Sequence, residues 1–134
     1  MHKKALILIV DDNAEFRELL AWILETQGFQ TISATGGREA VELAIEYQPR
    51  LVLMDLNMPG MNGYEATLAI HSHRHGRKIP VMAVSADYVD HPDSESWALA
   101  AGFVAFLPKP FEQEALLQIV RRLLTGGAGR TRAA

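Results

Sequence analysis

The chain has 134 residues, of which 49% are apolar and 22% charged, a balance typical of one globular domain and not of a disordered segment. Its 13 Lys and Arg against 16 Asp and Glu give a net charge of −3, which argues against direct nucleic-acid binding and against a polybasic membrane anchor. Cysteine is absent, which excludes disulfides and thiolate sites, and the apolar run of residues 5–10 is too short for a signal peptide or a membrane span, so we expect a cytoplasmic domain.

Strand-like and helix-like segments alternate along the chain. Residues 5–10 are continuously apolar and rich in branched side chains, as in a strand covered on both faces. An N-cap is expected near Asn13, and apolar residues at helical spacing from Phe16 to Leu24 predict a helix that stops at Gly28. The same alternation predicts further strands at residues 29–34, 51–54, 79–84 and 103–107, and further helices at residues 36–49, 64–70, 92–101 and 111–124.

This order of elements predicts an α/β fold with a parallel sheet, right-handed crossovers and helices on both faces. Such sheets bind ligands outside the carboxyl ends of their strands. In the helix of residues 36–49, the residues expected to point inward are Ala40, Val41, Leu43, Ala44 and Tyr47. Glycines at residues 126–129 cannot continue the last helix, so residues 126–134 are expected to be a flexible tail or linker.

Polar residues follow most of the predicted strands. Asp11 and Asp12 come after the first strand, Asp55 after the third, Ser85 at the end of the fourth and Lys109 just after the fifth. A single Asp after a strand is usually a helix cap. Carboxylates gathered at one edge of a sheet repel one another, however, and a hard divalent ion such as Mg²⁺ compensates them with oxygen ligands.

The motifs at these positions resemble the receiver domain of two-component response regulators, of the kind found in chemotaxis regulators. They are Asp11-Asp12, the run Met-Asp-Leu-Asn-Met-Pro-Gly-Met-Asn-Gly at residues 54–63, Val84-Ser85-Ala86 and Lys109-Pro110-Phe111. The resemblance covers about residues 5–125 and implies a flavodoxin-like, doubly wound, five-stranded parallel sheet in the order 2-1-3-4-5, with five helices on both faces. It divides the chain into a receiver domain, residues 1–125, and the tail, residues 126–134.

The resemblance also implies a phosphoryl-transfer site. Asp55 matches the aspartate that accepts a phosphoryl group from a histidine kinase or a phosphotransfer domain. Asp11 and Asp12 match the pair that holds Mg²⁺ (or Mn²⁺) together with Asp55, with the backbone carbonyl of Asn57 completing the coordination. Lys109 matches the lysine that pairs with a phosphoryl oxygen.

Four further positions match the switch. Ser85 matches the hydroxyl that bonds the phosphoryl group, and Ala86 the small residue that leaves the site open. Phe106 matches the aromatic residue that moves inward when Ser85 is drawn to the phosphoryl group, which changes the surface of helix 4, strand 5 and helix 5 for a downstream protein or a second copy of the chain. Pro110 matches a position where the family often has a cis peptide bond.

Two features fall outside this pattern. Asp87 lies two residues after Ser85 in a loop that is longer than usual for the family. Its carboxylate, together with Asn57, is a candidate for tuning the loss of the phosphoryl group. His71, His73 and His75 cannot all converge from one helical face, and nearby cations oppose a metal, so a solvated or partner-facing surface is the preferred interpretation.

Two other function classes fit the sequence less well than the receiver. An Mg-dependent phosphohydrolase with an Asp nucleophile usually has a general acid two residues later, but here that residue is Asn57. A phosphate-independent interaction domain would not need the complete set of site residues. The sequence leaves open whether the receiver stands alone or is part of a hybrid kinase or a larger regulator.

Overall fold

The computed structural model describes residues 4–86 and 94–125. Its core is a five-stranded parallel sheet with the spatial order β2-β1-β3-β4-β5. The strands are β1 (Leu6–Val10), β2 (Gln30–Ala34), β3 (Leu51–Met54), β4 (Val81–Ser85) and β5 (Ala105–Pro108), and the helices are α1 (Ala14–Thr26), α2 (Gly37–Tyr47), α3 (Gly63–Ser72), α4 (Ser94–Ala100) and α5 (Gln113–Thr125). The predicted flavodoxin-like fold is confirmed.

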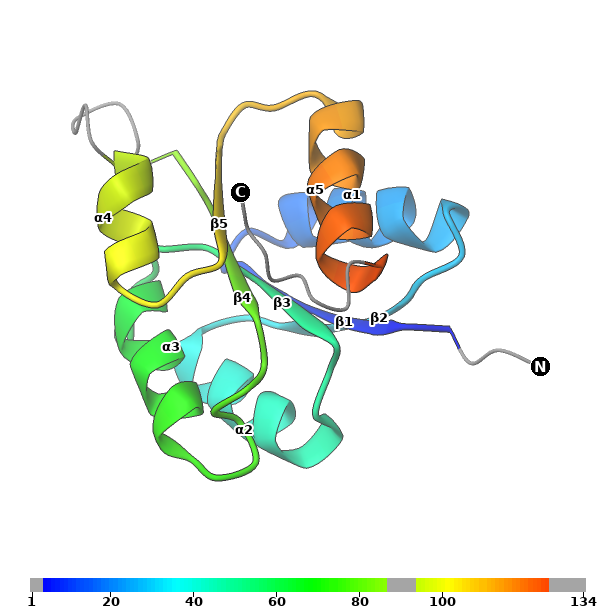
Figure 1. Ribbon diagram of the computed structural model, residues 1–134. Coiled ribbons are helices and arrows are strands. Elements are labelled where there is room, and N and C mark those ends of the chain that lie inside the picture. The colour runs from blue at the N-terminus through cyan, green and yellow to red at the C-terminus, as the bar shows by residue number, and fades with distance from the viewer. Residues whose placement is uncertain (1–3, 87–93, 126–134) are drawn as a thin grey trace.

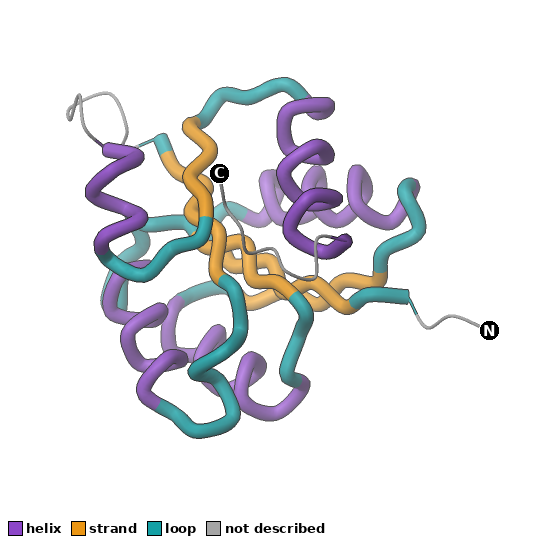
Figure 2. The backbone as a smooth tube through the Cα atoms, viewed as in Figure 1, coloured by secondary structure: helices purple, strands orange, loops and turns teal. Residues whose placement is uncertain are grey.

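The helices form two layers around the sheet (Figure 1, Figure 2). Helices α1 and α5 cover one face, and α2, α3 and α4 cover the other. In β1, Ile7 and Ile9 pack toward α1 and α5, whereas Leu8 and Val10 pack into the opposite layer. Because successive side chains point to opposite faces, a strand buried on both sides has to be apolar throughout.

Four predicted strands begin later than expected, β1 by a single residue, and in the other three the preceding turn uses their first residues. The amide of Phe29 donates to the carbonyl of Leu24 and so closes α1, and that of Phe103 donates to the carbonyl of Ala98 and closes α4. The amide of Ile79 donates to the carbonyl of Gly76. Apolar side chains in these turns are buried or partly buried like those of a strand. The hydrophobic pattern alone therefore does not distinguish the end of a turn from the start of a strand.

The expectation that Tyr47 points inward is wrong, because its side chain is 51% exposed. Tyr47 is the last residue of α2, and the chain turns at Gln48 in the left-handed conformation. This turn brings Pro49 to a buried position and leaves Tyr47 outside. Within residues 4–86 and 94–125, no helix combines the length and the apolar character needed to cross a membrane.

Candidate functional site

Two of the predicted acidic residues are fixed to the sheet by their own backbones. The amide of Asp11, just after β1, donates to the carbonyl of Ala34, and the amide of Asp55, just after β3, donates to the carbonyl of Val10. Both side chains are buried, whereas Asp12 is exposed. One carboxylate oxygen from each of Asp11, Asp12 and Asp55 lies within 4.8 Å of the others. The carboxyl edge of the sheet therefore gathers these three residues as expected.

Lys109 supplies the positive charge of this cluster. Its amide donates to the carbonyl of Ser85, which holds the start of the loop after β5 against β4. Its Nζ lies 2.8 Å from Asp11 Oδ2 and 3.9 Å from Asp55 Oδ2, and its side chain is 20% exposed. The ammonium thus bonds Asp11 directly and faces Asp55 at a longer distance.

Backbone donors orient the two buried carboxylates. The amide of Asn13 donates to Asp11 Oδ1 over 2.9 Å, and the amide of Asn57 donates to Asp55 Oδ1 over 3.3 Å. Asn13 is also the N-cap of α1, where its side chain accepts from the amide of Phe16. The turn that begins α1 and the turn after β3 therefore set the direction of both acids.

Burial raises the pKa of the Asp55 carboxyl from its ordinary value of 3.8 to about 6. The ammonium of the nearby Lys109 lowers the pKa of Asp55, and the charge of Asp11 raises it. The hydrogen bond from the Asn57 amide also lowers this pKa, and the charge of Asp12 raises it. With one ammonium facing three carboxylates, the site holds an excess of negative charge. Hard oxygen donors with this excess suit a divalent cation such as Mg²⁺.

The predicted switch residues lie at the same edge of the sheet. Ser85 ends β4 and is buried, and Ala86 after it is exposed. Since Met54 pairs with Ala83, Ser85 lies one strand away from Asp55 and one residue further along. Phe106 in β5 is buried in the core cluster on the side of α2, α3 and α4. The peptide bond between Lys109 and Pro110 is cis, at the position where the resemblance implies one, and Asp87 lies outside the described residues.

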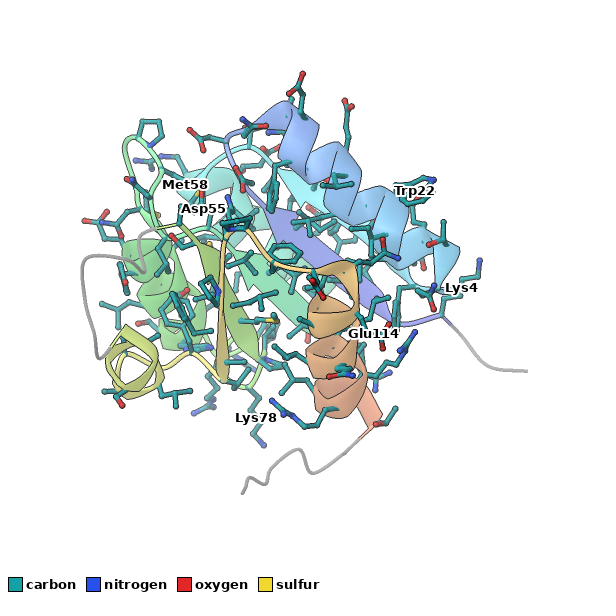
Figure 3. The ribbon with its side chains drawn as sticks, turned by 90° about the horizontal axis from the view of Figure 1, so that it is seen from above. Lys4, Trp22, Asp55, Met58, Lys78 and Glu114 are labelled. Carbon is teal, nitrogen blue, oxygen red and sulfur yellow. The ribbon has the colours of Figure 1, made fainter. Side chains whose placement is uncertain are left out.

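His71 lies near the end of α3, and His73 and His75 follow in the segment before β4. Lys78, in the same segment, lies at the opposite end of the sheet from Asp55 (Figure 3). The ring Nε2 of His71 lies 2.9 Å from the carbonyl oxygen of Ile79, which ties the end of α3 to the segment before β4. His73 and His75 are exposed beyond α3, with ring centroids 5.4 Å apart. Among the residues that the structure describes, the Asp cluster is the one group of three or more acids and histidines with closely spaced ligand atoms. His73 and His75 are exposed, as the solvated interpretation predicts, whereas His71 is half-buried against the segment before β4.

Two residues that the sequence analysis did not assign to the site contact it. The ring centroid of Phe16 on α1 lies 4.0 Å from Lys109 Nζ. Gly63, the first residue of α3, packs so closely on the backbone of Asp55 and Leu56 that a Cβ atom there would overlap Asp55 O and come within 2.8 Å of Leu56 Cα. Phe16 follows the acidic pair by about one helical turn, and this spacing could have identified it as a residue near the site. For Gly63, the one signal in the sequence is its position after the loop that follows Asp55.

Comparison with known proteins is consistent with this geometry. The family model described as the response regulator receiver domain matches residues 7–121. Protein PilH of Pseudomonas aeruginosa is 36% identical over 91% of this chain and 99% of its own length. Regulatory protein AtoC of Escherichia coli is also 36% identical, but the chain spans only 25% of that protein.

A solved structure places a metal in a similar fold. It is the receiver domain of the sensor histidine kinase PA1611 from Pseudomonas aeruginosa, crystallised with a magnesium ion coordinated in its active-site cleft. The two chains superpose with a TM-score of 0.82 at 30% identity, over 91% of this chain and 98% of the other.

Proposed function

The chain belongs to the response regulator receiver domain family and is a receiver domain of two-component signalling, and from this premise we propose that Asp55 is its phosphoryl acceptor. The observation that carries the proposal is the cluster itself. The carboxylate of Asp55 ends the central strand beside the carboxylates of Asp11 and Asp12, with the ammonium of Lys109 3.9 Å away.

The proposed reaction is a direct transfer between protein side chains. An oxygen of Asp55 attacks the phosphorus of a phosphohistidine on a histidine kinase or a phosphotransfer domain, and forms an O–P bond as the P–N bond of the donor breaks. The histidine nitrogen leaves with the bonding electron pair and takes a proton from solvent. Signal decay is the attack of water on the same phosphorus, which releases inorganic phosphate and restores the carboxylate. The chain thus changes only its own phosphorylation state and is a signalling domain, not an enzyme with a separate substrate.

The donor set fits Mg²⁺ or Mn²⁺ in its chemistry, since the carboxylates are hard oxygen ligands with excess negative charge. In the proposal, Asp11, Asp12, Asp55 and the backbone carbonyl of Asn57 hold the ion. When bound, it neutralises the oxygens of the transferring phosphoryl group. The amide that Asn57 already donates to Asp55 fixes the loop from which this carbonyl comes.

The other groups act on the phosphoryl oxygens or on their access to water. In the proposal, Lys109 moves its ammonium from the carboxylates to a phosphoryl oxygen, and the hydroxyl of Ser85 bonds another. Ala86, small and exposed, leaves the site open to the donor, and Asp87 with Asn57 tunes the attack of water. The cis bond before Pro110 belongs to the loop that carries Lys109.

We propose that phosphorylation is read out through β5. A Ser85 drawn toward the phosphoryl group leaves space into which Phe106 moves, and this changes the surface of α4, β5 and α5. Leu99 and Val104 on that surface are 47% and 42% exposed. This surface is proposed to bind a downstream protein, or a second phosphorylated copy of the chain.

The histidine partner is proposed to dock on α1. Leu19 and Trp22 lie one turn apart on this helix and are 48% and 61% exposed. In Figure 3, Trp22 stands on the outer side of α1. Large apolar side chains that stay exposed are the type of residue that anchors a protein interface. We also propose that residues 1–125 form the receiver unit and residues 126–134 a tail or linker.

The test is phosphorylation by a small donor. The chain is incubated with acetyl phosphate and Mg²⁺, and the mass of the intact protein and the site of modification are measured. One phosphoryl group is expected on the parent and on Glu42→Gln, an exposed acid on α2 that serves as the control, and none on Asp55→Asn. Continuous release of phosphate from an aryl phosphate would favour the phosphohydrolase, and a parent that takes up no phosphoryl group would refute the proposal.

A further inference from the structure

The ammonium of Lys109 lies between one aromatic ring and two carboxylates. Its Nζ is 4.0 Å from the ring centroid of Phe16, 2.8 Å from Asp11 and 3.9 Å from Asp55. We propose that Phe16 is a positioning residue for phosphoryl transfer, whose ring holds this ammonium in the site by a cation–π contact. The inference rests on the proposed function, because it concerns the group that meets the phosphoryl oxygens.

The ring of Phe16 is itself fixed in place. Its backbone amide donates to the Asn13 side chain in the cap that begins α1, which ties the ring to the turn after Asp11. On the other side, the ring of Phe111 meets it edge to face, with centroids 5.9 Å apart and an interplanar angle of 79°. The ring face of Phe16 is therefore already oriented toward the cation, and the ring loses little conformational entropy when Lys109 contacts it.

The ring matters because Asp11 has two roles in the site. In the structure its Oδ2 binds the ammonium of Lys109, yet the same carboxylate is a proposed metal ligand. An oxygen that coordinates a divalent ion is a poorer acceptor, and the added positive charge repels the ammonium. The contact of Lys109 with Phe16 is unaffected by this competition, because the ring carries no ligand atom for a metal.

Contact with a ring also differs from contact with a carboxylate in the number of ammonium N–H donors that stay available to other groups. The ammonium has three N–H donors, and a ring face attracts the charge without forming a strong directed hydrogen bond to any of them. Donors thus remain for a phosphoryl oxygen. A carboxylate in the place of Phe16 would hold Lys109 more firmly but would compete with the phosphoryl group for it.

The first experiment measures the rate of phosphorylation of Asp55 by acetyl phosphate at saturating Mg²⁺. A lost cation–π contact predicts a rate about fivefold lower for Phe16→Leu, and a rate within twofold of the parent for Phe16→Tyr, which keeps the ring. Phe29→Leu removes an equal ring that packs against the same core cluster, but just before β2 and thus at the opposite end of the sheet from Lys109, and should stay within twofold. In a Lys109→Met background, Phe16→Leu should have no further effect.

The second experiment needs neither metal nor phosphate. The chain has four lysines, Lys3, Lys4, Lys78 and Lys109, so selective ¹³Cε labelling gives few signals to assign. In EDTA, the NMR order parameter of the Lys109 methylene is expected to fall in Phe16→Leu but to be retained in Phe16→Tyr and Phe29→Leu. Circular dichroism verifies that each variant is folded.

The outcomes separate this inference from the proposed function. If the parent is not phosphorylated at Asp55, the proposed function fails, and the order parameter still decides whether the ring holds Lys109. If Phe29→Leu is as slow as Phe16→Leu, or Phe16→Leu still slows the reaction without Lys109, packing explains the effect and the inference is wrong. An unchanged Lys109 order parameter in Phe16→Leu also overturns it.

Discussion

Replacing Asp55 by Asn should stabilise the metal-free protein, and the gain should depend on pH. The pKa of the Asp55 carboxyl is raised in the folded protein from 3.8 to about 6, chiefly by burial. Between these two pH values the folded chain binds a proton that the unfolded chain has released. The free energy of unfolding of the parent therefore falls as the pH rises through this window, and it levels off above the folded pKa.

The difference in pKa sets the size of the effect. At about 1.4 kcal/mol for each pH unit, a rise from 3.8 to about 6 corresponds to a cost of about 3 kcal/mol for ionised Asp55 at pH 8. Asn resembles the protonated carboxyl, so Asp55→Asn should recover most of this cost at pH 8 and nothing below pH ~4. Relaxation of the neighbouring groups makes about 3 kcal/mol an upper value.

The assay is urea unfolding in EDTA between pH 4 and pH 8.5, followed by circular dichroism. The control Glu42→Gln removes an exposed acid on α2 and should change the free energy of unfolding by less than about 0.5 kcal/mol at every pH. Equal stability of parent and Asp55→Asn at pH 8, or a gain that persists unchanged at pH 4, would refute the assignment of this cost to the ionised carboxylate.

Three other substitutions test the site and its support. Mg²⁺ at a hundred times its Kd should raise the free energy of unfolding of the parent by about 2.7 kcal/mol and so raise its unfolding temperature. Scanning calorimetry should find both increases strongly reduced in Asp12→Asn. Gly63→Ala should destabilise the fold by about 1–3 kcal/mol in urea unfolding, because a Cβ atom at Gly63 overlaps the backbone of Asp55 and Leu56. Thr67→Val should stabilise it by about 1 kcal/mol in the same assay, because the Thr67 hydroxyl is buried without a hydrogen-bond partner among the described residues.

The sequence predicts those parts of the fold that depend on local pattern. Strand β1 is apolar at every residue because helices cover both of its faces, and this alone identifies it. In a parallel sheet, residues that end different strands meet at one edge, so Asp11, Asp55 and Lys109 could be brought together although they are far apart in the chain. The pattern does not define where a strand begins, since turn residues such as Phe29 are partly buried as well.

The parts that the sequence does not predict depend on the exact path of the chain. Asp11 and Asp12 are neighbours of the same type, yet one is buried and the other exposed. The contact between Phe16 and Lys109 joins the first turn of α1 to the loop after β5, and no pattern in either segment indicates the other. Interactions over such separations require the tertiary structure.

The electrostatic cost of the site is closely tied to its proposed chemistry. A carboxylate with a pKa of about 6 is still roughly 90% ionised at pH 7, so Asp55 remains an anion and can act as a nucleophile. Its burial removes water that would otherwise shield it, which strengthens its attraction to any cation that enters. Lys109 alone does not neutralise the Asp55 carboxylate, because its short contact is with Asp11. The same burial of Asp55 that lowers the stability of the fold therefore strengthens the attraction of the site for a divalent cation, and in the proposed reaction the phosphoryl group follows once the negative charge is balanced.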